Sequence, residues 1–264
     1  MEDVKVSVIG LGVMGEVLVK MLIEAGLSQS NIAVKEKRSQ RLEEVKSKYK
    51  LISEDLDESR IIFLAVKPQD LVSSIESIRK EIQPGTLIVS IVAGVKCSRV
   101  ESYMGHNSRV IRVMPNTPLL VQEGMSVIAH GSTSTLDDLV WVEKLFSQFG
   151  KTLVVEEVLM DAVTAVSGSG PAYFYEFVHC MIESATSLGL KRAEAELLVK
   201  QTLFGASKML SKSGKDAVAL REEVTSPNGT THAALQVFYR SDFMKIVNDA
   251  MTAANDRSKE LSEE

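Results

Sequence analysis

Up to about residue 155 the chain alternates short apolar runs with longer stretches in which apolar residues recur at helical spacing. The run Ile61–Val66 is apolar throughout, which is typical of a strand covered on both faces in a parallel sheet. Strands that alternate with helices predict an α/β fold with a doubly wound, Rossmann-type sheet. The predicted strands occupy residues 4–9, 31–36, 61–66, 86–92, 109–114, 126–129 and 152–155.

From about Asp161 the strand pattern stops and helical periodicity takes over. Pro171 suits the first turn of a helix that runs to about Leu188, and a second helix is predicted from about Arg192 to Leu210. Both helices are apolar over faces wide enough to require burial on more than one side. Association with a second chain would cover these apolar faces, and an ordinary bundle within one chain is the alternative.

The change of pattern divides the chain into two predicted domains. Residues 1–158 are expected to form the α/β sheet domain, and residues 159–264 an all-α domain. A length of 264 residues accommodates both. A content of 45% hydrophobic and 25% charged residues is ordinary for globular proteins.

Net charge, cysteine content and the lack of long apolar runs limit the partners and the compartment that we expect for this protein. A formal net charge of -5 gives no broad basic field, which argues against nucleic acid or an anionic membrane. Cys97 and Cys180 cannot form a disulfide framework, and they suit a reducing compartment. The N-terminus lacks a signal-peptide pattern, and no apolar run is long enough to span a bilayer. We therefore expect a soluble, cytoplasmic protein.

The most informative local pattern is Gly10-Leu11-Gly12-Val13-Met14-Gly15, which directly follows the first predicted strand and opens a helix. A G-x-G-x-x-G turn in this setting binds the pyrophosphate of a dinucleotide. Gly10 allows the tight turn, Gly12 lets the main chain approach the phosphates, and Gly15 lets the helix pack closely on the strand. A glycine-rich loop without function is the alternative.

The residues after the second predicted strand bear on the choice of cofactor. Glu36 lies about 20 residues past the glycines, where a carboxylate can bind a ribose hydroxyl, and this favours NAD. Lys37 and Arg38 follow directly and suit the 2′-phosphate of NADP. Because two adjacent cations can outweigh one carboxylate, we expect NADPH to be preferred over NADH, with a solvated charge run as the alternative. Ser39 is expected to cap the next helix.

Small or turn-forming residues follow three later strands, and ligands of doubly wound sheets bind outside these carboxyl ends. We therefore expect these turns to converge on one crevice that borders the nicotinamide. Together with the glycine turn and the charged residues, the cofactor-binding residues predicted from these patterns are Gly10, Leu11, Gly12, Val13, Met14, Gly15, Glu36, Lys37, Arg38, Lys67, Pro68, Ala93, Gly94, Pro115 and Asn116.

In the helical half, polar groups are concentrated in Ser226-Pro227-Asn228-Gly229-Thr230-Thr231-His232. Asn-Gly after Pro predicts a tight turn, and Thr230 or Thr231 is expected to cap the helix that follows. Hydroxyls, free amides and a helix N-terminus together form a pocket for a carboxylate. A capped turn without a ligand is an equally good alternative on local pattern alone.

The histidines do not suggest a metal site. His106, His130, His179 and His232 stand far apart, and the sequence has no C-x-x-C or H-E-x-x-H pattern. We therefore predict no bound metal and mostly structural histidines. His232 is a minor candidate for a proton donor because it adjoins the polar stretch.

The motifs taken together resemble those of the Δ1-pyrroline-5-carboxylate reductase family over nearly the whole chain. As a set they are highly specific, whereas the glycine turn alone is not. The matching segments are Gly10–Gly15, Ala65–Pro68, Ala93–Val95, Arg112–Pro118, Gly168–Tyr173 and Ser226–Thr231.

The resemblance implies NAD(P)H-dependent reduction of 1-pyrroline-5-carboxylate to L-proline, the final step of proline biosynthesis. It implies that residues 1–158 bind NAD(P) and that residues 159–264 serve dimerisation and substrate binding. A homodimer is expected, with a decamer of dimers as a larger assembly. The resemblance adds Ala65, Val66 and Met114 to the predicted cofactor-binding residues. The implied substrate-binding residues are Ser226, Gly229, Thr230 and Thr231. Thr231 is the predicted catalytic residue, whose hydroxyl positions the imine rather than acting as a true acid.

Two positions depart from the family pattern. Asn228 stands where the family usually has the first of two glycines, and asparagine tolerates left-handed backbone conformations better than most residues. His232 stands where the family usually has an aliphatic residue, which changes the electrostatics beside the imine.

Two other functions fit a sheet domain followed by a helical domain. A β-hydroxyacid dehydrogenase would resemble a longer chain with a lysine-bearing active-site helix, and Lys191, Lys200 and Lys208 show no comparable motif. A dinucleotide sensor without turnover would have no use for the polar stretch at 226–231. The sequence therefore favours the reductase.

Overall fold

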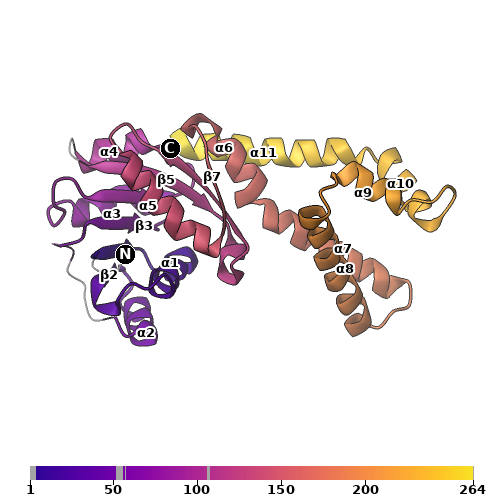
Figure 1. Ribbon diagram of the computed structural model, residues 1–264, viewed down its shortest axis with the longest axis horizontal. Coiled ribbons are helices and arrows are strands. Elements are labelled where there is room, and N and C mark those ends of the chain that lie inside the picture. The colour runs from indigo at the N-terminus through magenta and orange to yellow at the C-terminus, as the bar shows by residue number, and fades with distance from the viewer. Residues whose placement is uncertain (1–3, 52–55, 57, 106–107, 264) are drawn as a thin grey trace. The chain divides into compact units, whose positions relative to one another are not determined.

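The structure is a computed structural model that describes residues 4–51, 56, 58–105 and 108–263. The chain forms two compact units, Met1–Ser169 with Ala254–Glu264, and Gly170–Ala253 (Figure 1). These units follow from packing, and the functional domains 1–158 and 159–264 stay a prediction. His106 lies outside the described residues.

A seven-stranded sheet in the order β2-β1-β3-β4-β5-β6-β7 forms the centre of the first unit. Strands β1 to β5 are parallel, β6 runs antiparallel to β5, and β7 is parallel to β6. This arrangement confirms the predicted mostly parallel, Rossmann-type sheet. The strands are β1 (Val6–Ile9), β2 (Ile32–Lys35), β3 (Ile61–Leu64), β4 (Leu87–Ser90), β5 (Arg109–Pro115), β6 (Gly124–His130) and β7 (Gly150–Val154).

Helices cover both faces of this sheet, because alternate residues of its central strands point to opposite sides. Val8 and Phe63 pack on one face in a cluster with Leu18 of α1. Ile62 packs on the other face with Ile75 of α3. The helices of this unit are α1 (Val13–Glu24), α2 (Ser39–Tyr49), α3 (Leu71–Ile78), α4 (Cys97–Met104), α5 (Leu136–Phe146) and α6 (Met160–Val163).

The prediction that Ser39 caps α2 is wrong. Arg38 occupies the N-cap position without a side-chain cap bond, and Ser39 is the first helical residue. The carboxylate of Glu36 organises this turn instead, because its Oε1 accepts from the backbone N–H of Arg38 at 3.1 Å. At α5, by contrast, Thr135 forms a capping box with Asp138.

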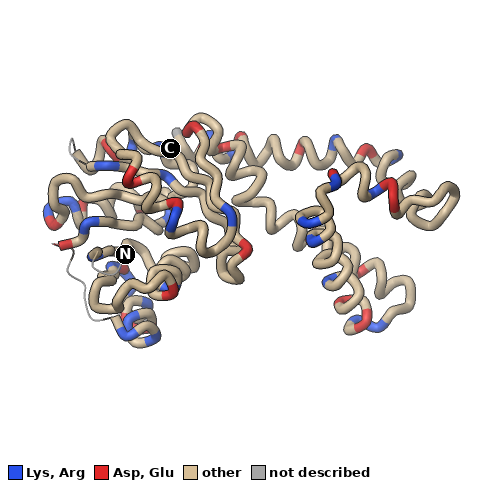
Figure 2. Tube along the Cα trace, in the orientation of Figure 1, with Lys and Arg blue, Asp and Glu red and all other residues tan. Residues whose placement is uncertain are grey.

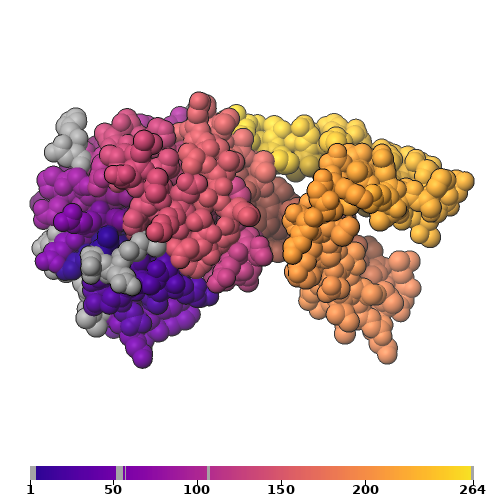
Figure 3. Space-filling model, viewed as in Figure 1, coloured from indigo at the N-terminus to yellow at the C-terminus, as the bar shows by residue number. Residues whose placement is uncertain are grey.

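All regular structure in the second unit is helical, and its residues, 170–253, can be found by the colour bar of Figure 3. Its small buried cluster contains Ile182, Ala195 and Val199, from the two longest helices that lie wholly within the unit. Many large apolar side chains on these helices are exposed. The helices are α7 (Gly170–Ser187), α8 (Arg192–Lys212), α9 (Ala217–Glu223), α10 (Thr230–Arg240) and the first part of α11 (Phe243–Glu263).

The last turns of α11 belong to the first unit. There the hydroxyl of Ser258 donates to Asp161 Oδ1 at 2.7 Å. Leu261 lies so close to Gly94 that a Cβ on the glycine would be 2.8 Å from Leu261 Cβ. The turn after β4 therefore accepts the end of α11 because residue 94 has no side chain.

Charges of both signs are interspersed along each unit (Figure 2), so the net charge of -5 does not arise from one acidic segment. Among the helices of the described residues, none is long and apolar enough to cross a membrane.

Candidate active site

The glycine turn at the end of β1 shows a different constraint at each glycine. Gly10 has φ +90°, and a Cβ there would lie 2.8 Å from the carbonyl oxygen of Ala65. A Cβ on Gly15 would overlap the carbonyl oxygen of Gly10. A Cβ on Gly12, the N-cap of α1, would meet nothing within 4 Å. Gly10 and Gly15 therefore permit close packing, whereas Gly12 presents bare backbone to open space.

The peptide groups of Leu11 are held on both sides by polar side chains. The N–H of Leu11 donates to Glu36 Oε2 at 2.8 Å, and its carbonyl accepts from Arg41 Nε at 2.8 Å. Arg41 also pairs with Glu16 of α1. The end of β2 and the first turn of α2 thus fix the orientation of the glycine turn.

Glu36 itself is held by Arg38 in a two-pronged ion pair. Arg38 Nε donates to Oε1 at 3.0 Å, and Arg38 Nη2 donates to Oε2 at 3.1 Å. This bond from Arg38 is the main reason why the pKa of Glu36 falls from 4.5 to about 2; burial opposes the shift, and the N–H of Leu11 adds to it. The carboxylate is therefore ionised at neutral pH and already has several donors.

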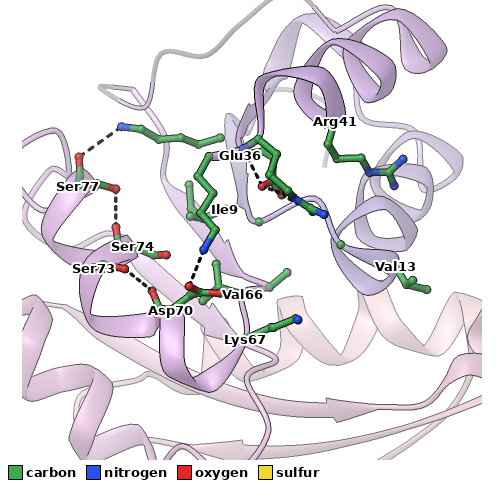
Figure 4. A pocket seen from close by; sticks show the side chains of 16 residues that line it. Ile9, Val13, Glu36, Arg41, Val66, Lys67, Asp70, Ser73, Ser74 and Ser77 are labelled. Atoms are coloured by element: carbon green, nitrogen blue, oxygen red, sulfur yellow. Dashed lines mark hydrogen bonds and ion pairs between the residues drawn. The ribbon is translucent and has the colours of Figure 1, made fainter.

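A pocket of about 850 Å³ opens beside this turn (Figure 4). Its walls come from the glycine turn, the residues that follow β2, the connection from β3 to α3 and one face of α3. Its volume is within the range of small-molecule and cofactor sites. Of the predicted cofactor-binding residues, it is lined by Gly10, Gly12, Val13, Glu36, Lys37, Arg38, Ala65, Val66 and Lys67.

The other predicted cofactor-binding residues do not line this pocket. Gly94 contacts Leu261, and Asn116 uses its side chain to donate to the Ser167 carbonyl at 3.1 Å and to accept from the Met125 N–H at 2.8 Å. Their role at the nicotinamide end stays a prediction. The remaining residues of this group are Leu11, Met14, Gly15, Pro68, Ala93, Met114 and Pro115.

Several lining residues were missed by reasoning from the sequence. Arg41 reaches the glycine turn only through the tertiary fold, and no local motif marks it. Ser73 and Ser77 are one helical turn apart, and this spacing just after a strand could have indicated hydroxyls on one helix face. The missed residues are Ile9, Lys35, Arg41, Ser73, Ser74 and Ser77, whereas Asp70 belongs to the turn after β3 that was expected to border the crevice.

Most cations of the pocket have a carboxylate partner. Because of this pairing, the pocket presents positive groups to an anionic ligand and carries no large unbalanced positive charge. The pairs are Lys35–Glu81, Lys37–Asp70, Arg38–Glu36 and Arg41–Glu16.

The polar stretch of the second unit is a tight turn before α10. Asn228 has φ 57°, in the left-handed region that asparagine tolerates, and the N–H of Gly229 donates to the Ser226 carbonyl at 3.0 Å. The prediction that Thr230 or Thr231 caps α10 is wrong. The turn brings Gly229 to the N-cap, so both threonines lie inside the first helical turn, without a side-chain cap bond.

The two threonine hydroxyls therefore remain available for a ligand, because neither has a hydrogen-bond partner among the described residues. Ser226 and Thr230 are exposed, and Thr231 is half-buried. Within the described part of the chain, no group of three or more His, Cys, Asp or Glu side chains could hold a metal ion.

Comparison with known proteins places these features in a family. Residues 157–261 match a family model described as pyrroline-5-carboxylate reductase dimerisation, and residues 5–94 match one described as NADP oxidoreductase, coenzyme F420-dependent. A pyrroline-5-carboxylate reductase of Methanosarcina acetivorans is 38% identical over 99% of this chain and 99% of its own. Pyrroline-5-carboxylate reductase 2 of Bacillus subtilis is 34% identical over 98% of this chain and 96% of its own.

Two solved structures also resemble this chain over nearly its whole length. A pyrroline-5-carboxylate reductase from Coxiella burnetii has a TM-score of 0.88 at 32% identity, covering 98% of each chain. The Plasmodium falciparum pyrroline carboxylate reductase with NADP bound also has a TM-score of 0.88, at 30% identity over 99% of each chain.

The sheet, the glycine turn and the pocket define a Rossmann-type oxidoreductase that binds a nicotinamide dinucleotide. The chain belongs to the pyrroline-5-carboxylate reductase family, which confirms the resemblance predicted from its motifs.

Gly12→Val tests the role of the open backbone in this turn. The valine side chain would fill the space that a pyrophosphate needs, so we expect the affinity for NADPH to fall by more than about tenfold. The unfolding free energy should fall by no more than about 1 kcal/mol, because the extended N-cap backbone accepts a side chain. Titration calorimetry and urea unfolding measure the two effects. Unchanged NADPH affinity would remove this turn from the site.

Glu36→Gln tests the pH dependence of the contacts that the Glu36 carboxylate makes with Arg38 and Leu11. Because the pKa of Glu36 is lowered from 4.5 to about 2, its stabilisation is complete above pH 4.5 and is lost as the pH falls through about 2. We expect the variant to be less stable by about 1 to 3 kcal/mol at pH 7, with the difference shrinking below pH 4.5. Urea unfolding at several pH values measures it, with Glu24→Gln on the surface of α1 as the matched control. A difference that is independent of pH would contradict the assigned cause.

Proposed function

We propose that this chain reduces 1-pyrroline-5-carboxylate to L-proline with NADPH as the hydride donor. The observation that carries the proposal is the dinucleotide pocket at Gly12 in a chain related to pyrroline-5-carboxylate reductases over 98% of its length. The direct test is oxidation of NADPH, followed at 340 nm, that depends on added 1-pyrroline-5-carboxylate and forms proline. Tight NADPH binding without any such oxidation would favour a sensor.

The residues of the first unit fit a dinucleotide. The open space at Gly12 and the free helix N-terminus suit the pyrophosphate, and Arg38 and Lys37 suit a 2′-phosphate. When bound, the reduced nicotinamide supplies the hydride to the imine carbon. A proton on the ring nitrogen completes the change from C=N to CH–NH, so a substrate that arrives protonated needs little acid catalysis.

The protein therefore contributes mainly binding and orientation. Ser226, Gly229 and Thr230 are the proposed contacts for the substrate carboxylate, because an anion is favoured at the start of a helix. Thr231 is the proposed contact for the region of the ring nitrogen. Both assignments are supported by the hydroxyls of Thr230 and Thr231, which have no hydrogen-bond partner in the described part of the chain.

A homodimer is the proposed minimal assembly. The second unit buries little apolar surface of its own and exposes many large apolar side chains, which a partner chain would cover. The match of residues 157–261 to a dimerisation family model supports this assembly. A decamer of dimers and a cytoplasmic location stay predictions.

Thr231→Ala is the sharpest test of the substrate contacts. If Thr231 orients the substrate, kcat/KM for 1-pyrroline-5-carboxylate should fall by roughly 10- to 100-fold, with NADPH affinity unchanged. Because Thr231 is not the N-cap of α10, the variant should keep its thermal stability. Steady-state kinetics and thermal unfolding of one preparation measure both. Thr231→Ser, which keeps the hydroxyl, should retain most of the activity, and full activity in Thr231→Ala would refute the role.

Sedimentation of the full chain tests the dimer, which should persist at micromolar concentration. Leu197→Glu with Phe204→Glu introduces charge on one exposed face of α8, and we expect it to weaken the dimer by more than about tenfold. Leu136→Glu is the matched control, because Leu136 is 79% exposed, compared with 70% for Leu197, but lies on α5 of the first unit. A monomeric full chain would contradict the proposal.

A further inference from the structure

Two cations at the edge of the pocket, Lys37 and Arg38, are bound to their carboxylates in different ways. Arg38 makes two parallel bonds to Glu36, whose side chain is only 5% exposed. Lys37 makes one contact, from Nζ to Asp70 Oδ1 at 2.6 Å, and its side chain is 71% exposed. Asp70 is 27% exposed and belongs to the turn Pro68–Asp70 after β3 (Figure 4).

These differences decide which cation can exchange its partner for a phosphate. Full release of Arg38 would leave the buried carboxylate of Glu36 without its main counter-charge, and an uncompensated buried charge is costly. A single ion pair with an exposed lysine, such as Lys37–Asp70, is weak in water, so Lys37 can leave Asp70 at a small cost. The cost of turning Lys37 toward a phosphate is therefore set by Asp70.

We propose that Asp70 is a specificity-determining residue that weakens the preference for a 2′-phosphorylated cofactor by competing for Lys37. The pair joins the segment after β2 to the turn after β3, and both residues line the pocket. The ligand class is an adenosine 2′-phosphate. The inference rests on the proposed function only in taking a dinucleotide with that phosphate as the cofactor.

Asp70→Asn in the full chain tests this competition, because it removes the charge and keeps the shape. The probes are 2′,5′-ADP and 5′-AMP, whose affinities are measured by titration calorimetry. We expect the ratio of the 2′,5′-ADP affinity to the 5′-AMP affinity to rise by about three- to tenfold. An unchanged ratio in a variant with the same thermal stability as the parent would overturn the proposal.

The same substitution in a chain without Lys37 separates competition for Lys37 from direct repulsion of the phosphate by Asp70. In a Lys37→Gln chain, Asp70→Asn should change the ratio much less, because only direct repulsion by the carboxylate remains. Equal changes in both backgrounds would show that Asp70 acts without Lys37, and would overturn the competition.

Glu81→Gln is the matched control. It removes the same charge from the pair Lys35–Glu81, which has an Nζ–Oε1 distance of 2.8 Å and in which Lys35 also lines the pocket. We expect a change in the ratio of less than about twofold. A change as large as that of Asp70→Asn would assign the effect to the general field of the pocket and overturn the proposal. Since the probes require no turnover, loss of reductase activity with a changed ratio would refute only the proposed function.

Discussion

The close approach of α1 to the end of β1 is the constraint on which the pocket depends. It exists because residues 10 and 15 carry no side chains, so the helix can begin directly over the carbonyl of Gly10. In this position the peptide groups of Leu11 face Glu36 and Arg41, which hold the turn from the neighbouring strand and helix. Gly12 is then the point at which main chain borders open space.

Local ion pairs provide the positive groups that an anionic cofactor needs in a chain of negative net charge. Glu16, Glu36, Asp70 and Glu81 each hold one cation at the pocket. Such pairing fixes the cations before a ligand arrives, and it also sets the cost of redirecting them. Buried pairs such as that of Glu36 mainly fix the shape of the site, whereas exposed pairs remain free to exchange partners.

The second unit has only a small hydrophobic core of its own. Its few buried residues join α7 and α8, and most of its large apolar side chains face outward. Hydrophobic burial within one chain therefore explains little of its helical structure. The turn before α10 keeps its tight geometry with asparagine at 228, because asparagine tolerates the left-handed backbone found there.

The sequence by itself determined the order of strands and helices, the sheet class and the glycine turn. These features depend on periodicity and on residues next to one another, which a local pattern records. The tertiary structure alone decided that Glu36 binds Leu11, that Arg41 reaches the same peptide, and that Lys37 pairs with Asp70. These contacts join residues that follow different strands. Which residues become partners therefore depends on how the turns after β1, β2 and β3 are arranged in space. The predicted caps at Ser39 and at Thr230 or Thr231 were wrong for a related reason, because a carboxylate contact and a left-handed turn set where those helices begin.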